Sequence, residues 1–245
     1  MKSPSPVAYK TIFRADFKPF LGFFGIFADA AQALEGYPDW MMDGPKVTVY
    51  DWAKRRSVIV EHTSFGFEQD SGDQNLETES IDQVLTILPK RFGIREFTRL
   101  GYRRKYLVPL EMSFESALAI LNTKMLRQEE LGSILPAPTD CLYRFDCVGK
   151  EQKFFITIAP ARKREFLRVL EFNQQFHLNP RGRAKDFEKI QETYPETALM
   201  LDIDCFQMGD AIKQEALVNF VLNARKQLEK IATDFNGYCF KAELE

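Results

Sequence analysis

Histidine is scarce in this sequence, with two residues among 245, and the common catalytic motifs are absent. The chain contains no G-x-S-x-G, H-E-x-x-H or G-x-G-x-x-G pattern and no P-loop. Because histidine is the side chain that most readily exchanges protons near neutral pH, acid–base catalysis has few candidates. These absences favour a non-enzymatic protein, and no pattern indicates a cofactor.

Cysteine and long apolar segments are scarce as well. The four cysteines form no C-x-x-C pair, which disfavours a zinc site. No segment approaches the roughly 20 apolar residues that a membrane span needs. The start of the chain, MKSPSPVAYKTIF, lacks the apolar run of a signal peptide. We therefore expect a cytoplasmic protein without membrane attachment.

Charge of one sign is also lacking, since 33 Lys and Arg stand against 35 Asp and Glu. A net charge of −2 removes the long-range attraction to phosphate that most nucleic-acid binders show, although a local basic patch remains open. Phenylalanine, in contrast, is abundant at 22 residues. This predicts a thick core and leaves open an apolar surface that needs a partner.

Alternating β-branched segments predict strands in the first half, and apolar residues at steps of three and four predict helices. Strands are expected at 9–17, 46–51, 56–69 and 95–109. Helices are expected at 21–36, 80–93 and 113–130, with Pro89 bending or ending the second and Ser113 capping the third. Loops are expected at 37–45 and in the polar segment 70–80.

The second half repeats this order. The sequence predicts a hairpin at 140–160 that turns near Gly149, a short helix at 185–195, a strand at 197–208 and a long helix at 210–236 capped by Asp210. Apolar residues of the long helix fall on one stripe, which includes Phe220, Ala224 and Leu228.

These patterns predict an α+β fold with two similar halves, each written as hairpin, short helix, strand and long helix. The halves are 1–130 and 140–245, joined by a linker at 131–139. We expect antiparallel strands, in two sheets or in one continuous sheet, with helices on one face. Residues 9–109 follow the βαββαβ order of ferredoxin-like domains. A helix-grip fold, with the C-terminal helix across a curved sheet, is the alternative.

The strand LGYRRKYLVP, residues 100–109, carries the strongest charge pattern. Side chains alternate between the two faces of a strand, so Tyr102 and Tyr106 share a face with Arg104. The other face carries three cations, which we call the cationic stripe: Arg99, Arg103 and Lys105.

An acidic strand complements this stripe, because Asp202 and Asp204 share the polar face of residues 197–206. If the two strands lie side by side, these carboxylates and cations form an ion-pair ladder. The alternatives are an anion or nucleic-acid groove on the stripe and a divalent-metal site at Asp202 and Asp204.

The two histidines fall in different settings. His62 is expected within a strand, hydrogen-bonded to a neighbour. His177 precedes a second basic cluster, whose Arg181, Arg183 and Lys185 surround Gly182 and could bind a phosphate through backbone N–H groups.

The two charged strands resemble the signature segments of a sporadically distributed, functionally uncharacterised bacterial family. Its members carry a strand like R-I-G-L-R-Y-I-N in mid-chain and one like L-L-D-L-D-Y-F near the C-terminus. Arg99, Gly101 and Arg103 match the first segment, which this chain leaves at its Tyr and Asn positions, occupied here by Arg104 and Tyr106. Residues 201–204 match the second segment. The resemblance implies a cytoplasmic bacterial protein and supplies no catalytic residue.

Three functions follow from these features. The first is a non-enzymatic module that binds a protein partner or a second copy, as part of a bacterial defence or toxin-linked system. The second is a binder of nucleic acid or a phosphorylated ligand through the cationic stripe and the loop 181–185. The third is a metal-dependent enzyme at Asp202 and Asp204.

Overall fold

A computed structural model describes most of the chain. The described residues are 5–19, 25, 29, 33–44, 46–70, 74–126, 138–167, 192 and 194–240. Most of the expected helix at 21–36, most of the linker 131–139 and most of the short helix 185–195 lie outside these residues.

The first part of the chain forms five strands. They are β1 (Val7–Asp16), β2 (Asp39–Asp43), β3 (Lys46–Asp51), β4 (Arg56–Glu61) and β5 (Ser64–Gln69). β-Branched residues in β3 and β4 favour extended backbone. The predicted strand 56–69 is two strands joined by a tight turn, and the predicted loop at 37–45 contains β2.

The middle of the chain alternates helix, strand and helix. These elements are α2 (Gln74–Phe92), β6 (Glu96–Pro109) and α3 (Phe114–Met125). α2 begins six residues before the expected position, within the segment predicted as a loop, and Pro89 lies inside it. Gly93 ends the helix with a φ of 65°, a conformation that glycine adopts without strain. Ser113 caps α3 as expected, since its Oγ accepts a 3.1 Å hydrogen bond from the Ser116 N–H.

The last part contains three strands and the longest helix. They are β7 (Tyr143–Val148), β8 (Lys153–Arg162), β9 (Thr197–Lys213) and α7 (Ala216–Phe240). β9 runs past the predicted end at 208, and Asp210 lies in the strand, so the expected cap is wrong. Phe220, Ala224 and Leu228 are buried on α7, as predicted.

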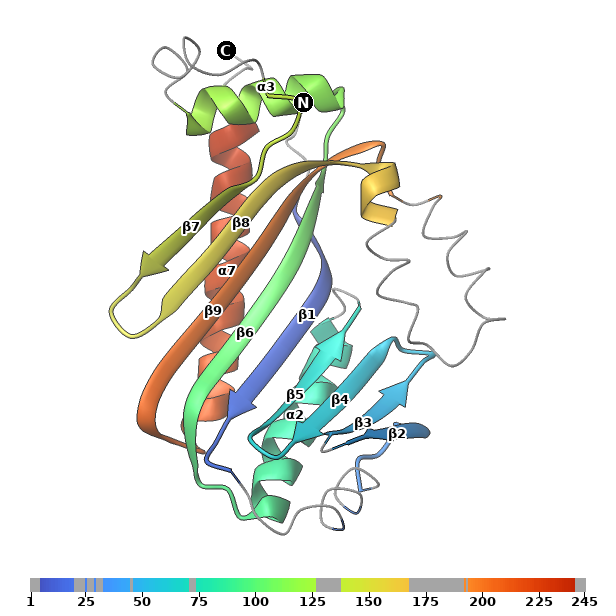
Figure 1. The fold of residues 1–245 in the computed structure, drawn as a ribbon, viewed down its shortest axis with the longest axis vertical. Helices are drawn as coiled ribbons and strands as arrows, with labels where there is room; N and C mark the ends of the chain where they lie inside the picture. Colours follow the sequence, from blue (N-terminus) through green and yellow to red (C-terminus); the bar gives the residue numbers. More distant parts are fainter. Residues whose placement is uncertain are drawn as a thin grey trace.

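The nine described strands form one sheet in the order β2-β3-β4-β5-β1-β6-β9-β8-β7 (Figure 1). All pairings between them are antiparallel. The α+β class and the antiparallel sheet are thus confirmed, in the form of one continuous sheet. β6 and β9, about 100 residues apart in the chain, are paired neighbours, as the ion-pair ladder required.

The two similar halves and the ferredoxin-like order are not confirmed. Six strands of the sheet precede residue 110 and three follow it, and four strands rather than two lie between β1 and α2. β1 sits between β5 and β6 and is antiparallel to both.

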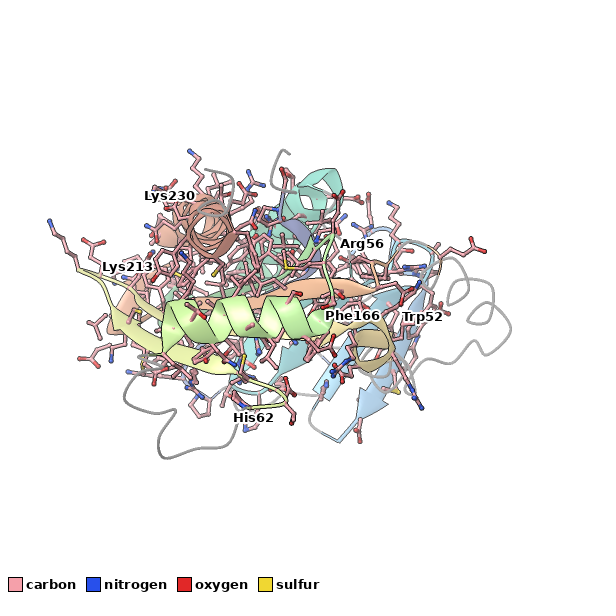
Figure 2. The ribbon with its side chains drawn as sticks, turned by 90° about the horizontal axis from the view of Figure 1, so that it is seen from above. Trp52, Arg56, His62, Phe166, Lys213 and Lys230 are labelled. Carbon is pink, nitrogen blue, oxygen red and sulfur yellow. The ribbon has the colours of Figure 1, made fainter. Side chains whose placement is uncertain are left out.

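α2 and α7 cover one face of the sheet. α2 packs against β5, and α7 packs against β6 and β9. The view along the long axis shows both helices on the same side, with Lys230 on the outer side of α7 and Phe166 on the opposite side of the sheet (Figure 2). α3 lies across one end of α7 (Figure 1). Among the described residues, no helix is both long and apolar enough to cross a membrane.

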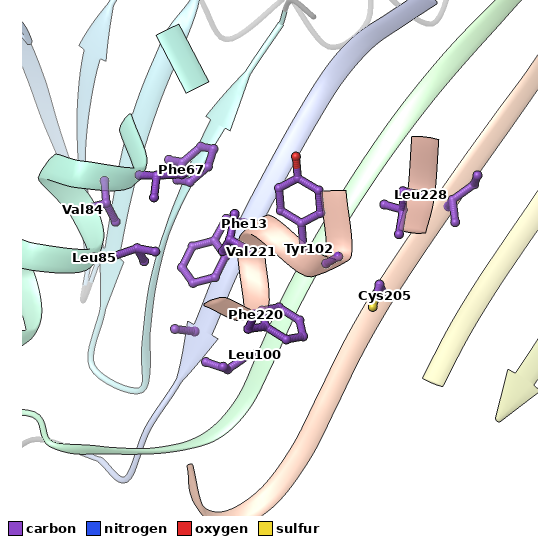
Figure 3. Close-up of a cluster of buried hydrophobic side chains, with 14 of the residues drawn as sticks. Phe13, Phe67, Val84, Leu85, Leu100, Tyr102, Cys205, Phe220, Val221 and Leu228 are labelled. Atoms are coloured by element: carbon purple, nitrogen blue, oxygen red, sulfur yellow. The ribbon is translucent and has the colours of Figure 1, made fainter. Parts of the chain in front are cut away.

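The main core fills the space between these two helices and the sheet. Its buried side chains, drawn in Figure 3, include Val84 and Leu85 of α2, Phe220, Val221 and Leu228 of α7, and Phe13, Phe67, Leu100, Tyr102 and Cys205 of the strands. At about 25 cal/mol per Å² of buried apolar area, such aromatic and aliphatic burial is the main term that stabilises the fold.

Candidate functional site

The sheet face away from α2 and α7, which we call the open face, carries the charged residues that the sequence singled out. On β6, Tyr102 and Arg104 contact Glu77 of α2, so the alternate residues Arg103 and Lys105 point to the open face. The open face is partly covered at one end, where Leu107 packs with Phe166 and Ala198.

The cationic stripe is paired with the acidic strand. Arg103 lies opposite Asp204 in the β6–β9 register and Lys105 lies opposite Asp202. The guanidinium of Arg103 nevertheless reaches diagonally, and its Nε donates a 2.7 Å hydrogen bond to Asp202 Oδ1 while Nη2 donates to Oδ2. Lys105 Nζ lies 3.7 Å from the same carboxylate. The predicted ion-pair ladder is therefore present, although Arg103 contacts the diagonal aspartate rather than the one directly opposite.

The remaining cation of the stripe, Arg99, bridges two carboxylates. It lies 3.9 Å from Asp204 and 3.6 Å from Asp16 of β1. Burial raises the pKa of Asp204, and the guanidiniums of Arg99 and Arg103 oppose this rise. Burial likewise lowers the pKa of Lys105, because the charged form is poorly solvated there. Each cation of the stripe thus has a carboxylate partner, which weakens its attraction for a free anion.

The other predicted site residues do not join this ladder in the described structure. Arg181, Arg183, Lys185 and His177 lie outside the described residues. His62 lies in the turn between β4 and β5 rather than within a strand, so the strand setting predicted for it is wrong. In the part of the chain that the structure describes, no three His, Cys, Asp or Glu side chains gather to hold a metal ion.

The structure contains a shallow groove beside the ladder, which we did not predict from the sequence. It has a volume of about 520 Å³ and runs over β7, β8 and β9 on the open face. Its lining is formed by Arg99, Asp146, Cys147, Val148, Lys153, Phe155, Phe206 and Met208. Val148 is 80% exposed and Met208 is 65% exposed, which leaves apolar atoms in contact with solvent.

Two aromatic rings form the floor of this groove. Phe155 and Phe206 lie with ring centroids 4.9 Å apart at an interplanar angle of 47°. Arg144 stands 4.9 Å from the Phe155 centroid and Arg99 stands 5.2 Å from that of Phe206. These cation–π contacts hold the rings in place and put positive charge at the groove edge.

The sequence did contain a signal for this groove. Phe154 and Phe155 are adjacent in a strand, so one of them has to face away from the helices. Phe154 packs against the main core, whereas Phe155 lies opposite Asp204 and shares its open face. We predicted a thick core from the number of phenylalanines and did not separate Phe154 from Phe155.

On the covered side, a buried ionic cluster joins both helices to β6. Arg104 contacts Glu77 of α2, and its Nη1 donates a 2.7 Å hydrogen bond to Glu229 of α7. Tyr102 donates its hydroxyl proton to the same Glu77 carboxylate. Burial raises the pKa of Tyr102 well above its usual range and that of Tyr106 to about 12, so both phenols stay neutral. These contacts tie α2 and α7 to β6.

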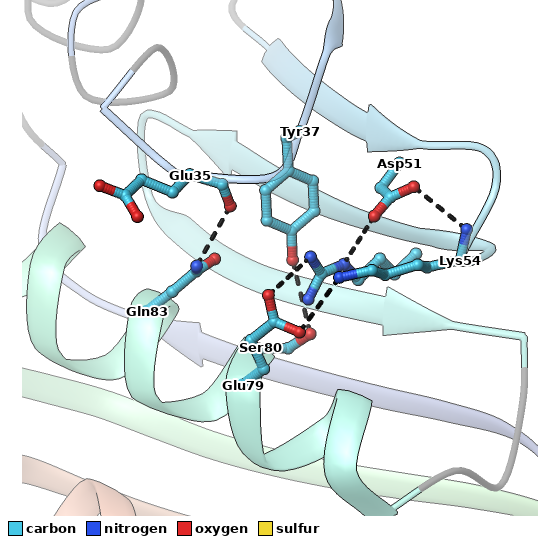
Figure 4. A network of polar contacts seen from close by, with 8 residues as sticks. Glu35, Tyr37, Asp51, Lys54, Glu79, Ser80 and Gln83 are labelled. Carbon is cyan, nitrogen blue, oxygen red and sulfur yellow. Dashed lines mark hydrogen bonds and ion pairs between the residues drawn. The ribbon is translucent and has the colours of Figure 1, made fainter.

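A second cluster, centred on Arg56, fastens α2 to the β3–β4 hairpin (Figure 4). The buried guanidinium donates to Asp51 at 3.3 Å and to Glu79 of α2 at 3.0 Å. Its carbon centre stands 4.7 Å from the ring centroid of Tyr37. Removing Arg56 would leave the buried Asp51 carboxylate without its cationic partner, so this cluster too stabilises the fold.

Comparison with known proteins adds no assignment to this geometry. The chain matches no protein-family model and no curated protein sequence.

Proposed function

We propose that this chain is a non-enzymatic binding module that holds a segment of a protein partner in the groove over β7, β8 and β9. The observation that carries this proposal is the apolar lining of the groove on an otherwise charged face. Exposed apolar side chains clustered within a polar rim are typical of a surface that a partner covers.

The chemistry of the groove suggests what the segment contains. Phe155, Phe206 and Met208 offer an apolar floor for one aliphatic or aromatic side chain. Lys153 stands at its edge and favours an acidic residue beside that anchor. The partner we infer is therefore a peptide segment with an apolar anchor next to Asp or Glu.

A second candidate function is the binding of nucleic acid or a phosphorylated ligand on the same face. The rings of Phe155 and Phe206, each beside an arginine, resemble a platform on which bases stack. The pairing of Arg103 and Lys105 with Asp202 argues against it, because phosphate has to compete with a carboxylate in place. The same contacts make a metal-dependent enzyme at Asp202 and Asp204 the weakest candidate.

The resemblance to a bacterial family supports the wider setting that we propose, which is a cytoplasmic component of a defence or toxin-linked system. Arg103 and Asp202, which belong to the two resembling segments, are the residues that form the two-hydrogen-bond contact. A structural pairing of this kind accounts for both segments without assigning them a ligand.

Selection of short random peptides displayed on phage tests the proposed function. Peptides are selected on the wild-type protein and their affinity is measured by fluorescence anisotropy against Met208→Asp and Val218→Asp. Val218 is an exposed apolar residue of α7 outside the groove, so its substitution is the matched control. We expect an apolar anchor beside acidic residues, and an affinity at least about tenfold weaker for Met208→Asp alone.

The result that contradicts the proposal is equal affinity of all three proteins. Fluorescent single-stranded DNA and RNA are measured in parallel. Binding that falls steeply with salt and persists in Met208→Asp supports the second candidate instead.

A further inference from the structure

Among the described strands, β2 and β7 form the two edges of the sheet. The outer edge of such a strand presents unpaired backbone N–H and C=O groups, which can template pairing with another strand. The two edges differ in the charge pattern of their side chains, which decides whether a second copy of the same strand can pair there.

The hairpin between β7 and β8 determines which groups of β7 point outward. Gly149 donates its N–H to the Gln152 carbonyl at 2.8 Å, so Gly149 bonds inward to β8. Because hydrogen bonding alternates along an antiparallel strand, the odd-numbered residues of β7 bond to β8. The outward backbone groups of β7 therefore belong to Arg144, Asp146 and Val148. Leu142 is the next even-numbered residue and directly precedes the strand.

We propose that β7 pairs with β7 of a second copy of this chain, antiparallel and about a two-fold axis at Phe145. This register places Arg144 opposite Asp146 of the second copy, and Asp146 opposite Arg144. It also places Leu142 opposite Val148. Leu142 and Val148 are 66% and 80% exposed, so each covers an apolar side chain of the other copy.

The charge pattern selects this register over its neighbours. The nearest registers that keep the outward residues opposite one another are shifted by two residues. They put Arg144 opposite Arg144 or Asp146 opposite Asp146, and like charges directly opposite are destabilising. The selected register also lets all four outward residues form hydrogen-bonded pairs. A two-fold interface of this kind is self-complementary, as a homodimer requires.

β7 is also fixed in position by contacts with α3 and α7. The Tyr143 hydroxyl donates a 2.6 Å hydrogen bond to Asn122 Oδ1 of α3, and Phe145 packs on Phe235 of α7 with centroids 5.9 Å apart. Contacts on the covered side therefore fix the strand and reduce the ordering cost of association.

The opposite edge does not offer the same match. A two-fold pairing of β2 about Met41 would place Asp39 opposite Asp43 at both ends. Trp40 and Met42 are exposed there, but the paired carboxylates oppose self-association. The inference thus assigns the dimer contact to one edge.

Charge exchange on β7 tests the proposal with the purified full chain. Sedimentation equilibrium from about 1 to about 100 µM gives the dimer dissociation constant. We expect the wild type to dimerise, and Asp146→Arg and Arg144→Asp each to raise that constant at least about tenfold. An equimolar mixture of these two variants should form heterodimers, because every Arg then faces an Asp.

The mixture separates loss of the interface from loss of folding, since misfolded chains do not regain association on mixing. The double variant Arg144→Asp, Asp146→Arg should dimerise with itself for the same reason. The proposal is overturned if the wild type is still a monomer at the highest concentration. It is also overturned if the dissociation constant is the same in the single variants, or if the mixture of the two variants stays monomeric. Because Asp146 and Val148 also line the groove, the peptide function is judged separately, by the Met208→Asp variant, whose substitution lies on β9 rather than on β7.

Discussion

Arg103 binds Asp202 with two hydrogen bonds, although Asp204 is the residue directly opposite Arg103 in the β6–β9 register. The diagonal reach leaves Asp204 to Arg99 at 3.9 Å. Bidentate contacts between a guanidinium and a carboxylate are stronger and more directional than single ones, so the two aspartates are not equivalent.

A double-mutant cycle measures this difference. We expect Arg103→Ala and Asp202→Ala to show a coupling free energy of about 0.5–1 kcal/mol in urea unfolding, reduced because Arg103 is partly exposed. The cycle of Arg103→Ala with Asp204→Ala should give a smaller value. Equal coupling in both cycles would show that the pairing follows the register instead.

The buried cluster at Arg104 predicts a strong asymmetry between removal and replacement. Arg104→Ala leaves Glu77 buried without its partner, and we expect a loss of about 3–5 kcal/mol in the free energy of unfolding. The double substitution Arg104→Met with Glu77→Leu removes both charges and should recover most of that loss. Chemical denaturation of the three proteins checks this, and a double variant no more stable than Arg104→Ala contradicts it.

Two glycines that lie on either side of Arg14 of β1 predict different responses to alanine. A Cβ at Gly66 of β5 would lie 2.0 Å from the Phe13 carbonyl oxygen, so Gly66→Ala forces the backbone apart. We expect it to lower the free energy of unfolding by about 3 kcal/mol or more. A Cβ at Gly101 of β6 would meet nothing closer than 3.7 Å, so Gly101→Ala is the control. It should change stability by less than about 1 kcal/mol in the same thermal unfolding series.

Thiol labelling provides a probe of the β7 edge of the sheet. Cys147 is exposed on β7, whereas burial raises the pKa of Cys141 to about 11, of Cys205 to about 12 and of Cys239 to about 11. Because the thiolate is the reactive form, iodoacetamide near neutral pH should modify Cys147 first. Mass spectrometry should show one fast addition, which Cys147→Ser removes. Equal rates at several cysteines would mean that the other thiols are accessible.

The central pairing could be predicted from the sequence because three independent signals agreed there. Alternation along β6 separated Tyr102 from Arg103, the acidic residues of β9 alternated in the same way, and their charges were opposite. One face had to be buried, which set the parity of both strands. The choice between Asp202 and Asp204 as partner of Arg103 depended on side-chain reach and was beyond the pattern.

The errors have local physical causes. The turn at His62 and Thr63 contains no Gly, Pro, Asn or Asp, so nothing marked the boundary between β4 and β5. Ile212 fits the helical stripe of the following helix equally well, yet it pairs with Phe97 at the end of β9. A register shift between Phe97 and Arg99 also turns Phe97 into the core, against the alternation of β6.

The groove depended on tertiary structure in a different way. Its residues come from four strands, β6, β7, β8 and β9, and none belongs to a recognised sequence motif. The Arg56 cluster is similar, since Glu79 belongs to a segment that was expected to be a loop. Such sites arise only when separate elements meet, so residue spacing alone does not reveal them.

The placement of β6 beside β9 also bears on how the chain is made. β6 ends at Pro109 and its neighbour begins at Thr197, so roughly 90 residues separate the two on the ribosome. At a synthesis rate of about 5–20 residues per second, β6 is complete on the order of 5–20 s before β9 has been synthesised. During that interval its Leu100 and Tyr102 side lacks α7, and its free edge is open to any nascent strand nearby. We therefore expect the yield of folded protein to depend on synthesis rate and chaperone access as well as on final stability.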